Sequence, residues 1–479
     1  MKTTMHSTKL NAILLFLIAL DVSTVTAQGN AGRRQTAAST TIAQSGSVST
    51  TSTATLRARR DRVMQAAPDA LVLIRSRSRV MAENEDGFRQ NASFYYLTGL
   101  ENAIGALLVL DSRRHESWLF VPPPGQLPRI GPLMHAPYAY VDSSPSAASR
   151  LGLDHLVAWD EFAPFIDRRL AEDPSLIIRG PFSTDRTKTT TAELVGQYEP
   201  GLWESVLRTR WPKAQLGPMP GADALRTIKD ANEIDVLRRV AASSSVALRA
   251  GLAALRPGRR QRDAEVDVVA ACVRAGADAV SFWPWVMSGS NSDITKAFQS
   301  LADSRFLDRR MLAGELVRVD VGCAQENYEG DVGRTAPVSG RFNREQREAW
   351  DLFVAAYRAG LNAIKPGKTS KDVLAAWQGE FQRRRSQLQT TFGKRTAEVA
   401  LSAEGTTFWQ MHGVGLESAE GLVETFTAGQ VLAFEPILTV DGVGLYLEDM
   451  ILVTPDGAEV LTKGLPYTSF EIEAAMRRR

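Results

Sequence analysis

An internal repeat constrains the C-terminal half of this 479-residue chain more than any other feature. The tetrapeptide Arg-Ala-Gly-Leu at 249–252 recurs at 358–361. At the same offset in each copy stand an aliphatic residue, a basic residue, Pro and Gly, at 255–258 and 364–367. Pro-Gly typically ends a helix, and apolar residues at helical spacing precede the first copy. Strand-like sequence with carboxylates follows both copies. We therefore expect two related α/β halves over about 217–479 that share one site.

The first half carries a pair of aspartates with the spacing of a hairpin. Val317, Val319 and Val321 alternate with other residues, which predicts a strand that includes Asp320. A turn-prone segment at 325–330 separates this strand from Asp331. Such a hairpin places both aspartates side by side on adjacent strands. Two carboxylates that close repel each other unless a cation lies between them.

The second half repeats this arrangement with different residues. The segment VLAFEP at 431–436 is typical of a buried strand and carries Glu435, and Glu448 follows the turn-prone segment 441–444. His412 begins the segment HGVGL, in which the glycines allow close approach of the backbone. The chain has five histidines, and His412 is the only one between 217 and 479.

These five side chains form a ligand set for divalent cations. Four carboxylates and one imidazole suit ions such as Mn, Co, Fe or Zn. Four carboxylates also supply the charge and the bridging oxygens for two ions about 3.5–4 Å apart, and a water held between such ions can have a pKa near 7. We expect two divalent metal ions, with Mn as the first choice and Co, Zn or Fe as the others.

The segments around these residues resemble the metal-binding segments of a known family. VDVG, YEGDVGRT, HGVGLE, FEP and YLEDM, in this order, are similar to those of the pita-bread metallopeptidases, which include aminopeptidase P, prolidase and methionine aminopeptidase. The segment FRQNASFYYLTG at 88–99 resembles the accessory N-terminal domain of aminopeptidase P. The resemblance covers nearly all of 56–479. It implies an α/β (α+β) chain with an N-terminal α/β domain and a duplicated catalytic domain.

The resemblance also implies a role for each ligand. Asp320 would chelate one ion and His412 the other, while Asp331 and Glu448 would bridge both. Glu435 would be a ligand and the general base for the bridging water. The implied reaction is the hydrolysis of the N-terminal residue from a peptide substrate, and in the aminopeptidase P branch proline follows that residue.

Three positions depart from the family pattern. Lys296 and Ala419 stand where histidines usually contact the substrate and move protons, and Tyr446 stands where an arginine is common. General acid–base help is worth about 10²–10⁴ in rate. Three readings therefore stay open: an Xaa-Pro aminopeptidase whose activity is reduced or altered, a metal-binding pseudoenzyme, and a hydrolase of other amides.

Aromatic residues flank the predicted site, and they can serve either as core or as the wall of a substrate pocket. We interpret Trp283 and Trp409 as pocket lining, together with Lys296 and Tyr446. Their neighbours Phe282, Trp285 and Phe408 extend the same two clusters.

The remaining segments predict the domain organisation. Basic residues, an apolar run at 12–20 and small residues before position 28 are typical of a signal peptide over 1–27, which predicts a secreted or periplasmic protein without a stable membrane span after cleavage. Residues 28–55 are rich in Ser, Thr, Ala and Gly and predict a disordered linker. Apolar runs at 70–74, 106–110 and 118–121 predict strands of an N-terminal domain over 56–215. The catalytic domain follows over 216–479.

Composition excludes some partners. A net charge of +2, from 56 basic and 54 acidic residues, gives no reason to expect nucleic acid. The two cysteines, Cys272 and Cys323, are too few for a disulfide framework, so we expect buried thiols. A homo-oligomer is compatible with the sequence.

Overall fold

The fold is known from a computed structural model. It describes residues 51–77, 89–101, 103–122, 129–130, 134–135, 146–182, 199–219, 222–296, 299, 307–403, 405 and 409–477. The predicted signal peptide and residues 28–50 of the predicted linker lie outside these residues. No helix in the described part of the chain combines the length and the apolar character that crossing a bilayer requires.

The N-terminal region is a six-stranded sheet between helices. In the order of the sheet, its strands are β6 (His155–Ala158), β3 (Glu116–Val121), β2 (Leu107–Asp111), β1 (Ala70–Arg75), β7 (Ile177–Gly180) and β8 (Gln215–Pro218). The three strands predicted in this region, β1, β2 and β3, are confirmed. They pair antiparallel with one another, whereas β6, β7 and β8 pair parallel with their neighbours.

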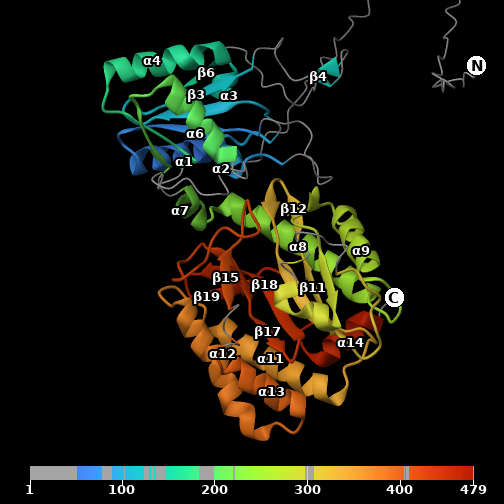
Figure 1. Ribbon diagram of the computed structural model, residues 1–479. Coiled ribbons are helices and arrows are strands. Elements are labelled where there is room, and N and C mark those ends of the chain that lie inside the picture. The colour runs from blue at the N-terminus through green and yellow to red at the C-terminus, as the bar shows by residue number, and fades with distance from the viewer. Residues whose placement is uncertain are drawn as a thin grey trace, which may run out of the picture. The chain divides into compact units, whose positions relative to one another are not determined.

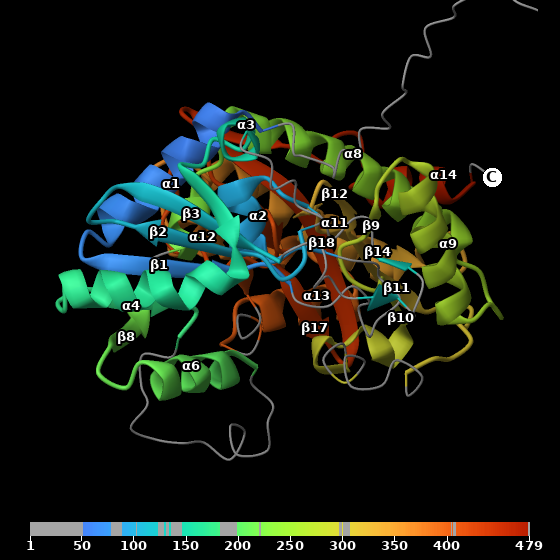
Figure 2. The ribbon, with the colours of Figure 1, turned by 90° about the horizontal axis from the view of Figure 1, so that it is seen from above.

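Alternating apolar residues give this sheet two buried faces. On β1, Val72 and Ile74 pack with the helices α1 (Thr53–Ala66) and α2 (Ala92–Thr98). Leu71 and Leu73 pack on the other face. There they meet α4 (Phe162–Glu172) and α6 (Glu199–Arg210). Figure 2 shows α1 and α4 on opposite sides of β1, β2 and β3. Side chains of alternating direction on a strand produce this three-layer arrangement.

Both predicted borders of the N-terminal domain shift by a few residues. Helix α1 begins at Thr53, inside the predicted linker, because the side chain of Ser52 accepts a hydrogen bond from the backbone N–H of Thr55 and caps the helix. At the other end, β8 runs through the predicted border at 215/216 and pairs with β7, so the sheet extends to Pro218. The predicted borders missed these residues because a cap and an edge strand are weak sequence signals.

The first copy of the repeat forms two helices followed by strands. Its main elements are α8 (Ala231–Ala254), α9 (Gln261–Arg274), β10 (Trp285–Ser288), β11 (Leu316–Val321) and β14 (Val332–Pro337). The short strands β12 (Cys323–Gln325) and β13 (Tyr328–Glu329) form the predicted hairpin between β11 and β14. The helix α7 (Ala222–Thr227) precedes this copy.

The second copy also has helices followed by strands, with α13 (Thr391–Ala400) as an additional helix. It consists of α11 (Arg344–Ala363), α12 (Ser370–Arg384), α13, β15 (Gln410–Gly413), β16 (Val431–Glu435), β17 (Ile437–Val440) and β18 (Val443–Thr454), followed by β19 (Gly457–Val460) and α14 (Ser469–Arg477). In both copies the glycine of the Pro-Gly joint has a positive φ, 83° at Gly258 and 80° at Gly367. The predicted duplication is therefore confirmed.

One sheet joins the two copies. Its strand order is β10-β11-β14-β18-β16-β15, so the inner strands β14 and β18 form the seam between the copies. In Figure 1, α11, α12 and α13 cover the strands of the second copy, while α8 and α9 lie beside β11 and β12. The central position of β14 and β18 brings residues from both halves of the chain to one place.

The repeated glycine explains how helix and strand approach each other. A Cβ at Gly251 of α8 would lie 3.0 Å from Val268 and 3.1 Å from Val319. A Cβ at Gly360 of α11 would lie 2.8 Å from the ring of Phe434. Val319 and Phe434 immediately precede Asp320 and Glu435. The shared Arg-Ala-Gly-Leu sequence thus fixes each helix against the strand that carries a predicted metal ligand.

The expectation of two free thiols is wrong. Cys272 of α9 and Cys323 of β12 form a disulfide, with their Cα atoms 5.5 Å apart. The helix α9 lies against the short strand β9 (Ala279–Val280), which pairs with β12, and this arrangement brings two half-cystines together that are 51 residues apart in the sequence. Sequence spacing gave no indication of this contact.

Charged contacts connect the N-terminal region to the first copy. The guanidinium of Arg59 contacts Asp230 at 2.6 Å and Glu233 at 3.3 Å. Arg89, from the FRQN segment, donates hydrogen bonds to Glu329 and to the backbone carbonyls of Val280 and Ser281. The FRQN segment therefore contacts the residues that surround the hairpin before Asp331.

Candidate metal centre

Three neighbouring strands position three of the predicted ligands around one glycine. Asp320 on β11 lies opposite Gly333 of β14, and Glu448 on β18 lies opposite Gly333 from the other side. Asp331 stands two residues before Gly333, just ahead of β14. All three carboxylates are buried, with exposed fractions of 5% for Asp320, 8% for Asp331 and 0% for Glu448.

Gly333 leaves room for an aromatic ring over this part of the sheet. A Cβ at this position would lie 1.9 Å from the ring of Tyr446. The ring therefore occupies the space above Gly333, and its hydroxyl donates a hydrogen bond to Glu448 and lies 3.4 Å from an oxygen of Glu435. Tyr446 thus orients the Glu448 carboxylate.

The strands β15 and β16 supply the other two predicted ligands. His412 lies opposite Ala433, two residues before Glu435, so both side chains lie on the same face of this pair. The Nε2 atom of His412 is 3.2 Å from Glu435 Oε1 and 3.9 Å from Asp331 Oδ2. Its Nδ1 atom lies 3.1 Å from the carbonyl oxygen of Gly413. An N–H at Nδ1 would donate to this carbonyl and leave Nε2 free to bind a metal ion.

The arrangement fits a bound cation. Ligand atoms of Asp331, His412 and Glu448 all lie within 4.8 Å of one another. Asp320 Oδ1 and Glu448 Oε1 are buried and have no hydrogen-bond partner among the described residues. Buried carboxylate oxygens without a partner are costly, and a divalent cation would satisfy them. The structure thus brings the five predicted ligands together.

The clustered carboxyl groups of Asp320, Asp331 and Glu448 have raised pKa values. Burial raises the pKa of Asp320 to about 7 against the opposing charge of Arg318. Burial, followed by the charges of neighbouring carboxylates, also raises the pKa values of Asp331 and Glu448 well above their usual range. Burial alone would lower the pKa of His412, but its hydrogen bond to Glu435 and the charge of that residue outweigh burial and raise it. Metal ions would take the place of the protons that such a cluster otherwise holds.

A pocket of about 240 Å³ opens onto this cluster. It is lined by Asp320, Asp331, Glu435, Arg318, Phe282, Trp285, Ile294, Ser418 and Ile437. The pocket therefore combines predicted metal ligands with an apolar wall, which is the usual composition of a site for a small ligand.

The residues expected to line a substrate pocket are only partly in place. Tyr446 is fully buried beside the ligands, as described above. Trp409 instead packs against Trp377 and Phe434 in the core. Trp283 is 38% exposed, and its indole N–H donates to Glu265. Trp409 and Trp283 are not among the residues that line the pocket.

Lys296 and Ala419, which stand at the positions where histidines are usual, do not line the pocket either. Lys296 is half-buried and is also not among the lining residues, whereas its neighbour Ile294 is. Ala419 is exposed next to Ser418. Phe408 lies outside the described residues.

Sequence reasoning missed Arg318 and the apolar residues Ile294 and Ile437 as pocket residues. For Arg318 a signal was present. It precedes Asp320 by two residues on a predicted strand, so both side chains had to lie on the same face. No comparable signal marked Ile294 or Ile437, because an isolated isoleucine is ordinarily a core residue.

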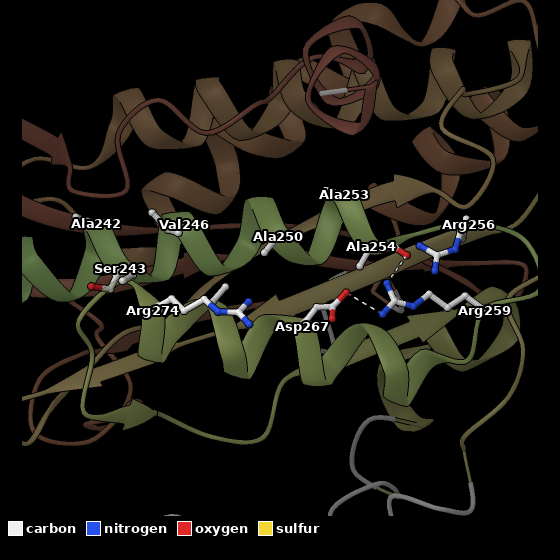
Figure 3. A pocket seen from close by; sticks show the side chains of 12 residues that line it. Ala242, Ser243, Val246, Ala250, Ala253, Ala254, Arg256, Arg259, Asp267 and Arg274 are labelled. Atoms are coloured by element: carbon white, nitrogen blue, oxygen red, sulfur yellow. Dashed lines mark hydrogen bonds and ion pairs between the residues drawn. The ribbon is translucent and has the colours of Figure 1, made fainter. Parts of the chain in front are cut away.

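A larger groove lies elsewhere, between α8 and α9 (Figure 3). It measures about 680 Å³ and is lined mainly by alanines, with the charged residues Arg256, Arg259, Asp267 and Arg274. Asp267 is its one carboxylate and forms an ion pair with Arg259 at 2.8 Å. The groove therefore lacks the ligand set found at the metal centre.

Comparisons with known proteins agree with this architecture. Residues 235–455 match the family model described as metallopeptidase family M24, and residues 56–136 match the one described as the N-terminal domain of aminopeptidase P. The chain is 25% identical to the Xaa-Pro aminopeptidase of Haemophilus influenzae, over 87% of this chain and 96% of that protein. It is 26% identical to the Xaa-Pro aminopeptidase of Escherichia coli, over 88% of this chain and 96% of that protein.

Solved structures show the same fold. A putative aminopeptidase P from Bacillus anthracis superposes with a TM-score of 0.71 at 20% identity, covering 89% of this chain and 99% of that chain. The low-pH form of aminopeptidase P from E. coli gives a TM-score of 0.69 at 24% identity, covering 90% and 100%. The two family models follow each other along the chain in the order of its two structural regions. Residues 235–455 of the chain belong to metallopeptidase family M24, and residues 56–136 belong to the N-terminal domain of the aminopeptidase P type.

Proposed function

We propose that this metal-dependent exopeptidase removes the N-terminal residue from peptides in which proline is the second residue, and that it uses two divalent metal ions. The observation that carries the proposal is the convergence of five ligands from both halves of the catalytic region. Atoms of Asp331, His412 and Glu448 lie within 4.8 Å of one another, and buried oxygens of Asp320 and Glu448 have no other partner among the described residues. The names of the relatives, Xaa-Pro aminopeptidases, favour this substrate class.

Each ligand has a distinct task in this proposal. Asp320 would help to hold one ion and His412 the other, and Asp331 and Glu448 would be shared between the two. Glu435 is both a ligand and the general base. The Oε1 atom of Glu435 is 3.2 Å from His412 Nε2, so this carboxylate oxygen lies beside the other proposed ligands. Glu435 also lines the pocket and therefore faces the space for substrate. We propose Mn²⁺ first, because oxygen ligands dominate the set.

The residues around the ligands determine how a peptide would react. Bound divalent ions supply a water molecule activated for attack on the peptide carbonyl. Glu435 accepts a proton from this water and passes it toward the leaving amine. Tyr446 holds Glu448 in place through its hydroxyl. Phe282, Trp285, Ile294 and Ile437 form an apolar wall that suits a proline ring.

We also propose that the protein is exported. The disulfide between Cys272 and Cys323 supports this, because structural disulfides persist mainly in oxidising compartments. The signal-like sequence at 1–27 supports it independently.

A second candidate is a metal-binding protein without peptide turnover. The observation in its favour is the lack of a second imidazole at the described site. Ala419 is exposed beside Ser418, and His412 is the only histidine after residue 217. Proton transfer to the leaving amine would then depend on Glu435 alone.

The test measures metal content and turnover on the same preparation. Purified protein is loaded with Mn²⁺, Co²⁺ or Zn²⁺, and bound metal is quantified by mass spectrometry. Peptides Ala-Pro-Ala and Ala-Ala-Ala then serve as matched substrates. We expect two ions per chain and faster release of alanine from Ala-Pro-Ala than from Ala-Ala-Ala. The Asp331→Asn variant should bind less metal and release alanine more slowly. Full metal occupancy without cleavage of either peptide would replace the proposal by the second candidate.

A further inference from the structure

A buried arginine in the pocket has no counter-ion within hydrogen-bonding distance. Arg318 lies on β11 with an exposed fraction of 0%. Its Nη2 atom is 3.9 Å from Asp320 Oδ2 and 3.7 Å from the sulfur of Met287. Its Nε and Nη1 atoms have no hydrogen-bond partner among the described residues. A buried charge without hydrogen-bonded partners is costly and usually has a functional reason.

Two other buried arginines show what a structural role looks like here. Arg334, on the adjacent strand β14, donates to Asp449 at 2.9 Å, to the carbonyl of Pro466 at 2.8 Å and to the carbonyl of Gly333 at 2.8 Å. Arg59 contacts Asp230 and Glu233. Arg59 leaves only its Nε atom without a hydrogen-bond partner among the described residues, whereas Arg318 leaves both Nε and Nη1 open and has its nearest carboxylate oxygen 3.9 Å away.

The open donors belong to a residue that lines the pocket beside the metal ligands. Arg318 and Asp320 are on the same face of β11, and both line the 240 Å³ pocket together with Asp331 and Glu435. The guanidinium carbon lies 5.3 Å from the ring centre of Trp285 and 5.1 Å from that of Tyr446. Both rings are within the range of cation–π attraction, which holds the guanidinium in place without using its N–H groups.

We propose that Arg318 is a substrate-binding residue that takes a carboxylate of the peptide. This inference rests on the proposed function, because it places the carboxylate next to the proposed metal ligands. A guanidinium matches a carboxylate in a bidentate, charge-assisted pair. Such a pair would use Nη2 together with one of the two donors that the fold leaves open, Nη1 for an end-on or Nε for a side-on approach. The enzyme therefore prefers anionic substrates over neutral ones.

Two parts of a peptide can supply this carboxylate. One is the C-terminal carboxylate of a dipeptide such as Ala-Pro, and the other is the side chain of Glu or Asp in the N-terminal residue. The first pair of test substrates is Ala-Pro and Ala-Pro-amide, and the second is Glu-Pro-amide and Gln-Pro-amide. Each pair differs only in one carboxylate, so the pair that the enzyme discriminates identifies the source.

The experiment compares kcat/KM for both pairs in the metal-loaded wild type and in Arg318→Met and Arg318→Lys. We expect the wild type to prefer the acid over the amide in one pair by about 10- to 100-fold, the usual value of a charged hydrogen bond. Arg318→Met should abolish the preference by raising KM for the acid, and Arg318→Lys should retain part of it. Arg238→Met, which changes an exposed arginine on α8, should keep the full preference. Metal content and melting temperature verify that each variant is folded and loaded.

Binding measurements keep the inference testable if no peptide is cleaved. Titration calorimetry with proline and prolinamide, and with glutamic acid α-amide and glutaminamide, replaces the kinetic comparison. Tighter binding of one acid to the wild type, lost in Arg318→Met, would support the inference even though the proposed function had failed. Equal kcat/KM or equal binding for acid and amide in both pairs would overturn it, and so would a preference that survives in Arg318→Met.

Discussion

The two halves of the catalytic region share a scaffold but contribute different chemistry to the site. In each half a glycine lets a helix approach the residue that precedes a predicted metal ligand, Val319 in the first half and Phe434 in the second. The first half adds aspartates and the buried Arg318, whereas the second adds glutamates and His412. Duplication thus provided a common frame for the strands, and the side chains facing the pocket then diverged. The result is a site with a cationic group on one side and an imidazole on the other.

The largest expected effect comes from the second half. Glu435→Gln keeps the size of the side chain but removes the proposed base, so kcat on Ala-Pro-Ala should fall by about 10²–10⁴. Initial rates at saturating substrate measure it. Glu424→Gln, which changes an exposed glutamate of the same half, is the control and should leave kcat unchanged. A Glu435→Gln enzyme with more than half of the wild-type kcat would mean that the base lies elsewhere.

The next largest expected effect is a loss of stability on removal of the disulfide in the first half. Among the described residues the disulfide joins α9 to β12 in the first half, and the chain has no cysteine left for the second. Replacing Cys272 and Cys323 together by alanine should cost about 2–4 kcal/mol of stability, because the unfolded chain gains freedom. The melting temperature reports the loss. A reductant should lower the melting temperature of the wild type toward that of the variant and leave the variant unchanged; identical melting of both proteins without reductant would contradict the cross-link.

A smaller effect compares the two repeated glycines directly. Gly360→Ala places a Cβ against Phe434, whose ring is stacked on Tyr357 at 4.6 Å, so it should cost about 1–3 kcal/mol. Gly251→Ala meets the more tolerant methyl groups of Val268 and Val319 and should cost less. Denaturant unfolding measures both.

The control for this pair lies in α12. Gly379→Ala has no atom within 4 Å of the new Cβ and should stabilise the protein by up to about 1 kcal/mol through helix propensity. If Gly251→Ala and Gly360→Ala behaved like Gly379→Ala, the close approach of helix and strand would be disproved.

The smallest effect concerns two matching hairpin turns. The two-residue turn of the first half has Glu326 and Asn327 at positive φ, while that of the second half has Asp441 and Gly442. Asn adopts this conformation more easily than Glu, but Glu326 also contacts Arg239 at 2.5 Å near the surface. Glu326→Asn should therefore raise stability by less than about 1 kcal/mol. Asp441 is already a residue type that favours positive φ, so Asp441→Asn should change the stability even less. A Glu326→Asn variant that melts at a lower temperature than the wild type would show that the ion pair with Arg239 contributes more than the turn conformation.

Much of this architecture could be predicted from the sequence because its signals are local. The Pro-Gly joints, the alternation around Asp320 and the FRQN segment each determine structure within a few residues. The order of the ligands along the chain was sufficient to propose one site. What brings them together is the pairing of β14 with β18, which no local pattern encodes; the recognised duplication implied only that the two halves share one site.

The errors have a common physical cause, which is long-range packing. Cys272 and Cys323 form a bond because α9 lies against β9, which pairs with β12. Trp409 is a core residue because Trp377 of α12 packs against it. Arg318 was overlooked because a basic residue on a strand is ordinarily solvated. The three-dimensional structure shows that it is fully buried and that its Nε and Nη1 atoms have no hydrogen-bond partner among the described residues.

The seam between β14 and β18 has a consequence for biosynthesis. Asp320 and Asp331 leave the ribosome long before Glu448, and β18 must pair with β14 before these carboxylates face one another. A nascent chain therefore carries no assembled hydrolytic centre while it is being made. The predicted ligands of both halves can converge only after β18 has been synthesised and has paired with β14.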